Sequence, residues 1–111
     1  MVNAGMKILM NLHGKRALVT GGAVRIGAAI TKALQAEGAD VVVHYRNSKA
    51  EAEALSPHTI QSDLESPGAC SRLIEQAGQL DILINNAGIT RDGLLLRMKE
   101  EDWNLVLQVN L

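Results

Sequence analysis

The sequence predicts an α/β fold, a doubly wound parallel sheet with helices on both faces. Three short apolar runs, at residues 17–19, 41–43 and 82–84, do not alternate with polar residues, which is typical of strands covered on both sides. Stretches with helical periodicity separate these runs, and a glycine turn, Gly21-Gly22, follows the first run directly. Right-handed crossovers then place the predicted strands in the order 3-2-1-4.

The first half of the chain contains two strand–helix units. Residues 15–20 form the first predicted strand, and Gly38 ends the helix that follows. Residues 40–45 form the second strand. Ser48 and Glu51 have the spacing of a capping box, which predicts a short helix from there through Leu55. The buried face of the first helix is predicted from apolar residues at helical spacing: Ile26, Ala29, Ile30, Ala33 and Leu34.

The second half repeats this pattern. Residues 58–61 form a weak third strand, and Ser66 and Pro67 suit the start of a third helix. Residues 81–85 form the fourth strand, 86–88 a turn and 89–97 a polar link. A last helix is expected from about Lys99, because apolar residues recur there at helical spacing. The apolar faces of these two helices are Ala69, Cys70, Leu73, Ile74 and Ala77, and then Trp103, Val106, Leu107 and Leu111.

Composition narrows the functional classes. A chain of 111 residues fits one domain, and its net charge of −1 gives no basic footprint for nucleic acid. No apolar run is long enough to span a membrane. Cys70 is the single cysteine, which suits a reducing compartment and predicts a cytoplasmic protein. Met1, Met6 and Met10 could each begin the chain, so residues 1–9 are expected to form a flexible extension before a domain over 10–111.

Polar and glycine clusters follow the carboxyl ends of all four predicted strands. These clusters are Thr20–Gly22, Arg46, Asp63 and Asn85–Gly88. In an open parallel sheet, ligands bind at this edge, near the point where the strand order reverses. The glycine turn leads into a helix whose free N–H groups can hold a phosphate. An ordinary tight turn with a steric need for glycine explains the same residues.

Two of these motifs resemble the short-chain dehydrogenase/reductase family. Thr20-Gly21-Gly22-Ala23-Val24-Arg25-Ile26-Gly27 is similar to the family's glycine motif, with Arg25 in place of the middle glycine, and Asn85-Asn86-Ala87-Gly88 matches its second signature. The stretch 88–103 is similar to the branch that reduces 3-oxoacyl thioesters of acyl carrier protein. Residues 44–48 are more similar to the pteridine-reductase branch. The resemblance implies a partial Rossmann-type fold.

The residues after the second strand favour NADP(H) over NAD(H). Sites for NAD place an acid there to bind the ribose hydroxyls, whereas this chain has Tyr45-Arg46-Asn47-Ser48. Arg46 can pair with a 2′-phosphate, and Arg25 can add to the same positive site. A solvated loop arginine is the alternative.

The resemblance implies further contacts to the cofactor. Asp63 and Leu64 match the family's adenine contact, although an Asx turn explains Asp63 equally well. Asn86, Ala87 and Gly88 match a backbone approach to ribose, although Asn86 can also tie strand ends together. The predicted cofactor-binding residues are Gly21, Gly22, Ala23, Val24, Arg25, Ile26, Gly27, Tyr45, Arg46, Asn47, Ser48, Asp63, Leu64, Asn86, Ala87 and Gly88. No metal site is expected.

The family's chemistry is hydride transfer between the nicotinamide and a carbonyl, with a Ser and a Tyr-x-x-x-Lys motif beyond the last segment present here. Residues 10–111 are therefore expected to be the NADP-binding half, truncated before that motif. Tyr45 to Lys49 match the pattern by chance, at the ribose end of the site. Asn110 matches an Asn of the family's proton relay, or is a buried Asn bonded to backbone.

The expected substrate is a small carbonyl compound, including an acyl-carrier-protein thioester, and the complete protein is expected to be a homo-oligomer. A non-catalytic nucleotide-binding or interaction module is the alternative.

Overall fold

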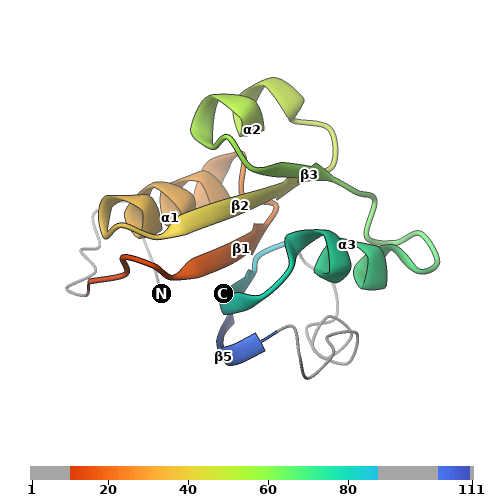
Figure 1. Ribbon diagram of the computed structural model, residues 1–111. Helices are drawn as coiled ribbons and strands as arrows, with labels where there is room; N and C mark the ends of the chain where they lie inside the picture. Colours follow the sequence, from red (N-terminus) through yellow and green to blue (C-terminus); the bar gives the residue numbers. More distant parts are fainter. Residues whose placement is uncertain (1–10, 88–102, 111) are drawn as a thin grey trace.

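The computed structural model describes residues 11–87 and the strand Trp103–Asn110, which form a parallel sheet with helices on both faces (Figure 1). The sheet order is β3-β2-β1-β4-β5. This order confirms the predicted 3-2-1-4 arrangement and adds a fifth strand beside β4. The elements are β1 (Arg16–Thr20), α1 (Arg25–Ala36), β2 (Asp40–Tyr45), α2 (Lys49–Leu55), β3 (Thr59–Gln61), α3 (Ala69–Ala77), β4 (Leu80–Asn85) and β5 (Trp103–Asn110).

Each face of the sheet has its own apolar core, because successive side chains of a strand point to opposite faces. Ala17 and Val19 of β1 pack with α1 and α2, whereas Leu18 between them packs with α3. Both faces are buried, which is why the strands read as unbroken apolar runs. The fully buried residues Leu18, Val19, Val42, Leu73 and Leu83 represent the two cores.

The last predicted helix is wrong. Trp103–Asn110 is a strand that pairs in parallel with β4, with Asn110 opposite Asn85. The residues alternate between apolar and polar from Trp103 to Asn110, with Val106 as the exception, which is a strand pattern. Backbone N–H and C=O groups along the edge of β4 also need partners, and β5 provides them. The expected onset near Lys99 and the 89–97 link lie outside the described residues, as do 1–9.

Two helix starts also differ from the prediction. Helix α3 begins at Ala69, not at Ser66 or Pro67, because Gly68 has a left-handed conformation with φ of 77°. The Ala69 N–H donates to the Ser66 carbonyl (3.1 Å) as a turn before the helix. Ser48 is the N-cap of α2 as predicted, but its side chain makes no capping hydrogen bond, so the capping box does not form.

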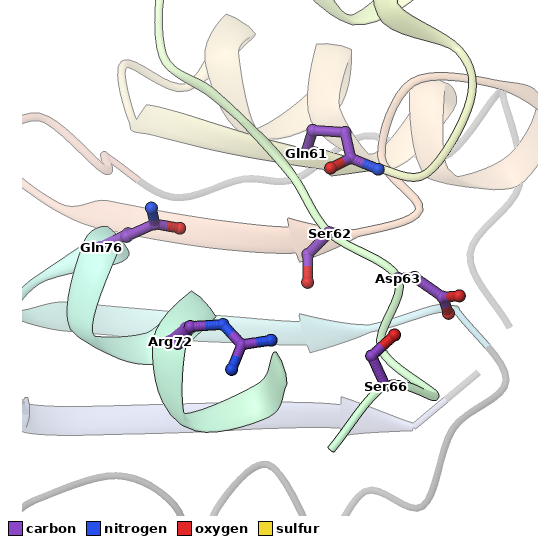
Figure 2. A pocket seen from close by; sticks show the side chains of 6 residues that line it. All are labelled: Gln61, Ser62, Asp63, Ser66, Arg72 and Gln76. Atoms are coloured by element: carbon purple, nitrogen blue, oxygen red, sulfur yellow. The ribbon is translucent and has the colours of Figure 1, made fainter. Parts of the chain in front are cut away.

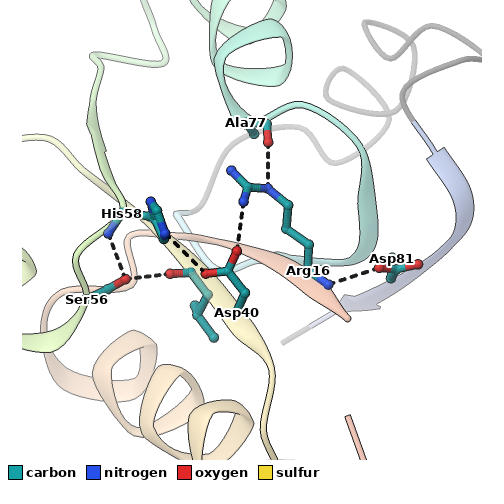
Figure 3. A network of polar contacts seen from close by, with 7 residues as sticks. Arg16, Asp40, Ser56, His58, Ala77 and Asp81 are labelled. Carbon is teal, nitrogen blue, oxygen red and sulfur yellow. Dashed lines mark hydrogen bonds and ion pairs between the residues drawn. The ribbon is translucent and has the colours of Figure 1, made fainter. Parts of the chain in front are cut away.

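Arg16, at the amino end of β1, connects the amino ends of β2 and β4 with the carboxyl end of α3 (Figure 3). Its Nη1 donates to Asp40 Oδ2 of β2 (2.8 Å) and its Nε donates to the Ala77 carbonyl of α3 (2.8 Å). The Arg16 backbone N–H donates to Asp81 Oδ2 of β4 (2.9 Å). His58 lies on the far side of Asp40, with 3.7 Å between its Nε2 and Asp40 Oδ1. This network lies at the end of the sheet opposite to the glycine turn.

Within the described part of the chain, no helix combines the length and apolar character that a membrane crossing needs. The same residues contain no group of three or more His, Cys, Asp and Glu side chains placed to hold a metal ion.

Candidate functional site

The carboxyl ends of the parallel strands meet at one edge of the sheet, here called the rim. Thr20, at the end of β1, lies opposite Asn85, at the end of β4. The segments after β1, β2, β3 and β4 all emerge at this edge, so the rim brings together Gly21, Arg46, Asp63 and Asn86. The predicted clustering of polar and glycine segments is therefore what the fold produces.

Thr20 is the hydrogen-bonding centre of the rim. Its buried Oγ1 accepts from the N–H groups of Asn86 (2.9 Å) and Ala87 (3.1 Å). Its own hydroxyl hydrogen lies within reach of Asn85 Oδ1 (3.3 Å). A hydroxyl offers one donor and two acceptor sites, so this arrangement uses all of them and fixes the turn after β4 against β1.

The glycine turn contacts the turn after β4 directly. Asn86 Nδ2 donates to the Gly21 carbonyl (3.2 Å). Gly21 has φ of 61°, a left-handed conformation that favours glycine. A Cβ on Gly27 would overlap the Gly21 carbonyl oxygen and lie 2.8 Å from Asn86 Nδ2. Gly27 is therefore required for close packing of α1 against the turn, and Asn86 does tie strand ends together.

The first turn of α1 is open to a ligand. Val24 is the N-cap but makes no side-chain capping bond, and Ala28 N–H donates to the Val24 carbonyl (3.1 Å). The N–H groups ahead of Ala28 thus point out of the helix end, where a phosphate can accept hydrogen bonds from them.

Two apolar side chains near this helix start, Val24 and Ile26, are exposed at 38% and 53%. The prediction that Ile26 lies on the buried face of α1 is wrong; Gly27 takes that place instead.

Arg25 has an unusual backbone conformation. It is exposed and has φ of 54°, and among the described residues it alone has a positive φ without being a glycine. A left-handed conformation costs a residue with a Cβ roughly 1–2 kcal/mol. This strain falls at the position where the resembling motif has its middle glycine. Arg25 is also the first residue of α1.

Arg46 and Asp63 form the polar end of the rim. Arg46 Nη2 lies 3.4 Å from Asp63 Oδ2, and both side chains are substantially exposed. Asp63 Oδ1 accepts a hydrogen bond from the Glu65 N–H (3.1 Å). Asp63 therefore also forms a local Asx turn, the alternative role that its sequence position suggested. A hollow of about 120 Å³ adjoins this pair, lined by Arg46, Ser62, Asp63, Leu64, Glu65 and Ala87.

A larger hollow of about 330 Å³ lies between the segment after β3 and helix α3 (Figure 2). Ser62 and Arg72 face each other there, whereas the Asp63 carboxylate points away from Arg72 toward the carboxyl ends of the strands. Arg46, Ala87 and the glycine turn do not line this hollow. It therefore lies beside the rim and not on it, and its lining residues are Gln61, Ser62, Asp63, Ser66, Arg72 and Gln76.

Some predicted residues lie away from the rim surface. Tyr45 is 9% exposed and packs in the core beneath α1 and α2, and Ala23 is 5% exposed in the same core. Both side chains therefore pack in the core and not on the rim surface. Asn47 is exposed and Ser48 is half-buried between β2 and α2. Gly88 lies outside the described residues. The backbone of Asn110 is at the rim end of β5, beside Asn85, and not on a helix face.

Sequence reasoning overlooked His44, which connects two rim segments. Its buried ring accepts from the Gly21 N–H at Nδ1 (3.0 Å), and its Nε2 lies 2.9 Å from the Ser62 carbonyl oxygen. The signal was a titratable residue following three valines in a strand buried on both faces. Burial lowers the pKa of His44, and the bond to Ser62 opposes this by raising it.

The fold and the strand order place this chain in the doubly wound class of α/β proteins. Comparison with known proteins narrows this class. The family model described as short chain dehydrogenase matches residues 15–111. The chain therefore belongs to the short-chain dehydrogenase family, as its motifs predicted.

Individual relatives agree with this assignment. The chain is 41% identical over 112 residues to 3-oxoacyl-[acyl-carrier-protein] reductase FabG of Escherichia coli, which covers 92% of this chain and 46% of that protein. FabG of Staphylococcus aureus is 42% identical over 110 residues, and this match covers 87% of this chain and 45% of that protein. This chain thus spans about half the length of these relatives.

Solved structures give the same result. A short-chain dehydrogenase from Burkholderia cenocepacia in complex with NADP is 42% identical, with a TM-score of 0.67, covering 84% of this chain and 43% of that one. A blue fluorescent protein from a metagenomic library, in complex with NADPH, is 42% identical with a TM-score of 0.67. The match covers 72% of this chain and 38% of that one.

Proposed function

We propose that the rim binds NADP(H) and that this chain is the cofactor-binding part of an oxidoreductase that reduces a carbonyl group. The contact between the two motifs carries the proposal: Asn86 Nδ2 bonds to the Gly21 carbonyl (3.2 Å) beside an uncapped helix start. The solved relatives in complex with NADP and NADPH support it.

The residues of the rim fit a phosphorylated dinucleotide. The turn from Gly21 to Gly27, with the first N–H groups of α1, fits the pyrophosphate, because the N–H groups at a helix start have no partner within the helix and can bind phosphate. Asp63 and Leu64 line the small hollow and fit adenine, with Ala87 at its edge. Exposed Val24 and Ile26 offer apolar surface to a ring of the ligand.

The preference for a 2′-phosphate depends on Arg46. Its side chain is 60% exposed and its contact with Asp63 is long, at 3.4 Å, so the guanidinium is available to a phosphate. Exposed ion pairs of this kind contribute little to stability, and a dianionic phosphate competes with Asp63 effectively. Arg25 supplies a second exposed cation, at the first residue of α1.

Substitution of Arg46 tests the cofactor preference. Arg46→Ala is expected to weaken NADPH about tenfold or more and to leave NADH nearly unchanged, since a charge-assisted hydrogen bond contributes roughly 1.5–3 kcal/mol. Isothermal titration calorimetry of both nucleotides measures this. Arg72→Ala, which removes an exposed arginine from the larger hollow, is the matched control and should alter neither affinity. An equal loss for NADPH and NADH would refute the role of Arg46.

The bound nicotinamide would supply or accept the hydride, and this chain would hold the adenosine and phosphate end. The sequence has one tyrosine, Tyr45, and it is buried in the core beneath α1. No tyrosine of this chain is therefore free to act as the general acid. We expect the 111-residue chain to bind NADPH without oxidising it. Oxidation of NADPH with an acetoacetyl thioester, followed at 340 nm, would contradict this expectation; a 3-oxoacyl thioester is the proposed substrate of the complete enzyme, given the FabG relatives.

A further inference from the structure

His44 uses both of its ring nitrogens to connect segments of the rim. Gly21 N–H donates to Nδ1 at 3.0 Å, and Nε2 lies 2.9 Å from the Ser62 carbonyl oxygen. The backbone of the same residue holds the turn as well, because Gly22 N–H donates to the His44 carbonyl (3.0 Å). One residue of β2 therefore holds both glycines of the turn and reaches across to the segment after β3.

The partners of His44 determine where its proton lies. A backbone N–H can only donate, so Nδ1 must accept from Gly21 and carries no hydrogen. The proton is then on Nε2, where it donates to the Ser62 carbonyl. A second proton on the ring would place an N–H group against the Gly21 N–H. The observed arrangement therefore requires the neutral imidazole.

We propose that His44 is a positioning residue, which sets the phosphate-binding turn at Gly21 against the adenine-binding segment at Ser62 and does so only as the neutral imidazole. The proposal rests on the nucleotide-binding function of the rim. Protonation of His44 would break the bond to Gly21 and release the turn, so nucleotide affinity is expected to fall in acid.

The surroundings leave the ring without a compensating charge. Asp63, beyond Ser62, is paired with Arg46, and Arg72 of α3 lies across the larger hollow from Ser62. Arg25 is the first residue of α1. Among the described residues, no ion pair involves His44 itself. Its register partner on β3 is Ile60, which carries no charge, and Thr20 at the end of β1 carries none either, so no carboxylate of the described residues pairs with the imidazolium.

Two substitutions separate the two bonds of the ring. His44→Asn places an amide oxygen near the position of Nδ1, which keeps an acceptor for Gly21 and cannot be protonated. His44→Gln places an amide nitrogen near the position of Nε2, which keeps the donor to Ser62 and leaves Gly21 unpaired. Circular dichroism and the unfolding temperature check that each variant is folded. Both substitutions remove the titration, so they differ only in which segment stays connected.

The affinities for NADPH and NADH between pH 5.5 and 8 give the decisive readout. For the wild type, both are expected to weaken toward acid, with a limiting slope of about tenfold per pH unit for one proton. His44→Asn should bind within about threefold of the wild type at pH 8 and lose this extra slope, whereas His44→Gln should bind about tenfold more weakly. The ligand's 2′-phosphate also titrates near pH 6, but it does so identically in all variants, and NADH lacks it.

Parallel pH profiles for the wild type and His44→Asn would overturn the proposal, and so would equal affinities for the Asn and Gln variants. A nitrogen-15 spectrum of the free protein tests the tautomer without any ligand, and a hydrogen on Nδ1 at pH 8 would also overturn it. If the protein binds neither nucleotide while the spectrum shows the hydrogen on Nε2, the proposed function fails and the neutral His44 bridge stands.

Discussion

Replacing Gly27 by alanine tests whether close packing at the glycine turn holds the rim together. Helix propensity alone predicts that Gly27→Ala stabilises the chain by roughly 0.5–1 kcal/mol, because Gly27 lies within α1. The structure predicts the opposite sign. The added Cβ would overlap the Gly21 carbonyl oxygen and approach Asn86 Nδ2 to 2.8 Å, and these two atoms bond to each other (3.2 Å).

The magnitude follows from these contacts. Overpacking of this kind costs about 1–3 kcal/mol, and loss of the Asn86 bond to Gly21 costs about 0.5–1.5 kcal/mol. After the gain in helix propensity, the free energy of unfolding should fall by about 1–3 kcal/mol. Urea unfolding followed by circular dichroism and by the fluorescence of Trp103, the one tryptophan, measures this change.

The nucleotide affinity gives a second readout of the same variant. Displacement of Gly21 opens the phosphate turn, so Gly27→Ala should lose most of its affinity for NADPH. Gly14→Ala is the control, because Gly14 has φ of 81° but open space around it; it should cost about 1 kcal/mol of stability and leave NADPH affinity unchanged. A Gly27→Ala variant as stable as the wild type, or more stable, would refute the packing argument.

Four further predictions concern the rim and the opposite end of the sheet. Thr20→Val should lower the free energy of unfolding by about 1–3 kcal/mol, because two backbone N–H groups lose their acceptor, while Thr20→Ser should recover most of it; urea unfolding distinguishes the two. Arg25→Gly should raise the free energy of unfolding by up to about 1 kcal/mol by relieving the positive φ and should weaken NADPH binding; a loss of stability would show that Arg25 is not strained. Arg16→Met should lower the unfolding temperature, because the bonds to Asp40 and Ala77 disappear, and most of the change should persist in 0.5 M salt if the bond to the backbone dominates. Burial lowers the pKa of His44 from 6.5, so its contribution is fully present above pH 6.5 and is lost as the pH falls toward the folded-state pKa; the difference in unfolding free energy between the wild type and His44→Asn should shrink over that range by at most about 1.4 kcal/mol per pH unit.

The sequence was sufficient to predict the central strands and their order. Unbroken apolar runs are distinctive in β1, β2 and β4, because these strands are buried on both faces. The same property hides which face a given residue takes. Nothing in the run from Val41 to Tyr45 indicates that His44 reaches two rim segments while Tyr45 packs in the core, so sequence reasoning singled out Tyr45 and overlooked His44.

Sequence reasoning was wrong about the strand Trp103–Asn110 and about the start of α3, and the two errors have different physical causes. The run from Trp103 to Asn110 is short and Val106 breaks its alternation, so helical and strand periodicities overlap there; the need of β4 for a pairing partner favours the strand. At α3, Ser66 and Pro67 are good starting residues, but the left-handed Gly68 interrupts the helix before it forms. The strand depends on pairing with β4, a contact between residues distant in sequence. The start of α3 depends on the left-handed conformation of Gly68, which glycine can adopt but does not have to.

The position of β1 between β2 and β4 has a consequence for how the chain folds. On one side β1 pairs with β2, which is close to it in sequence, but on the other side Thr20 reaches Asn85, 65 residues away. Closing the longer loop costs more chain entropy, so we expect the seam between β1 and β4 to join late. Until then the apolar edge of β1 is open to other chains. A nucleotide that lies across this seam binds only the joined state, and by mass action it would protect the newly made chain from aggregation.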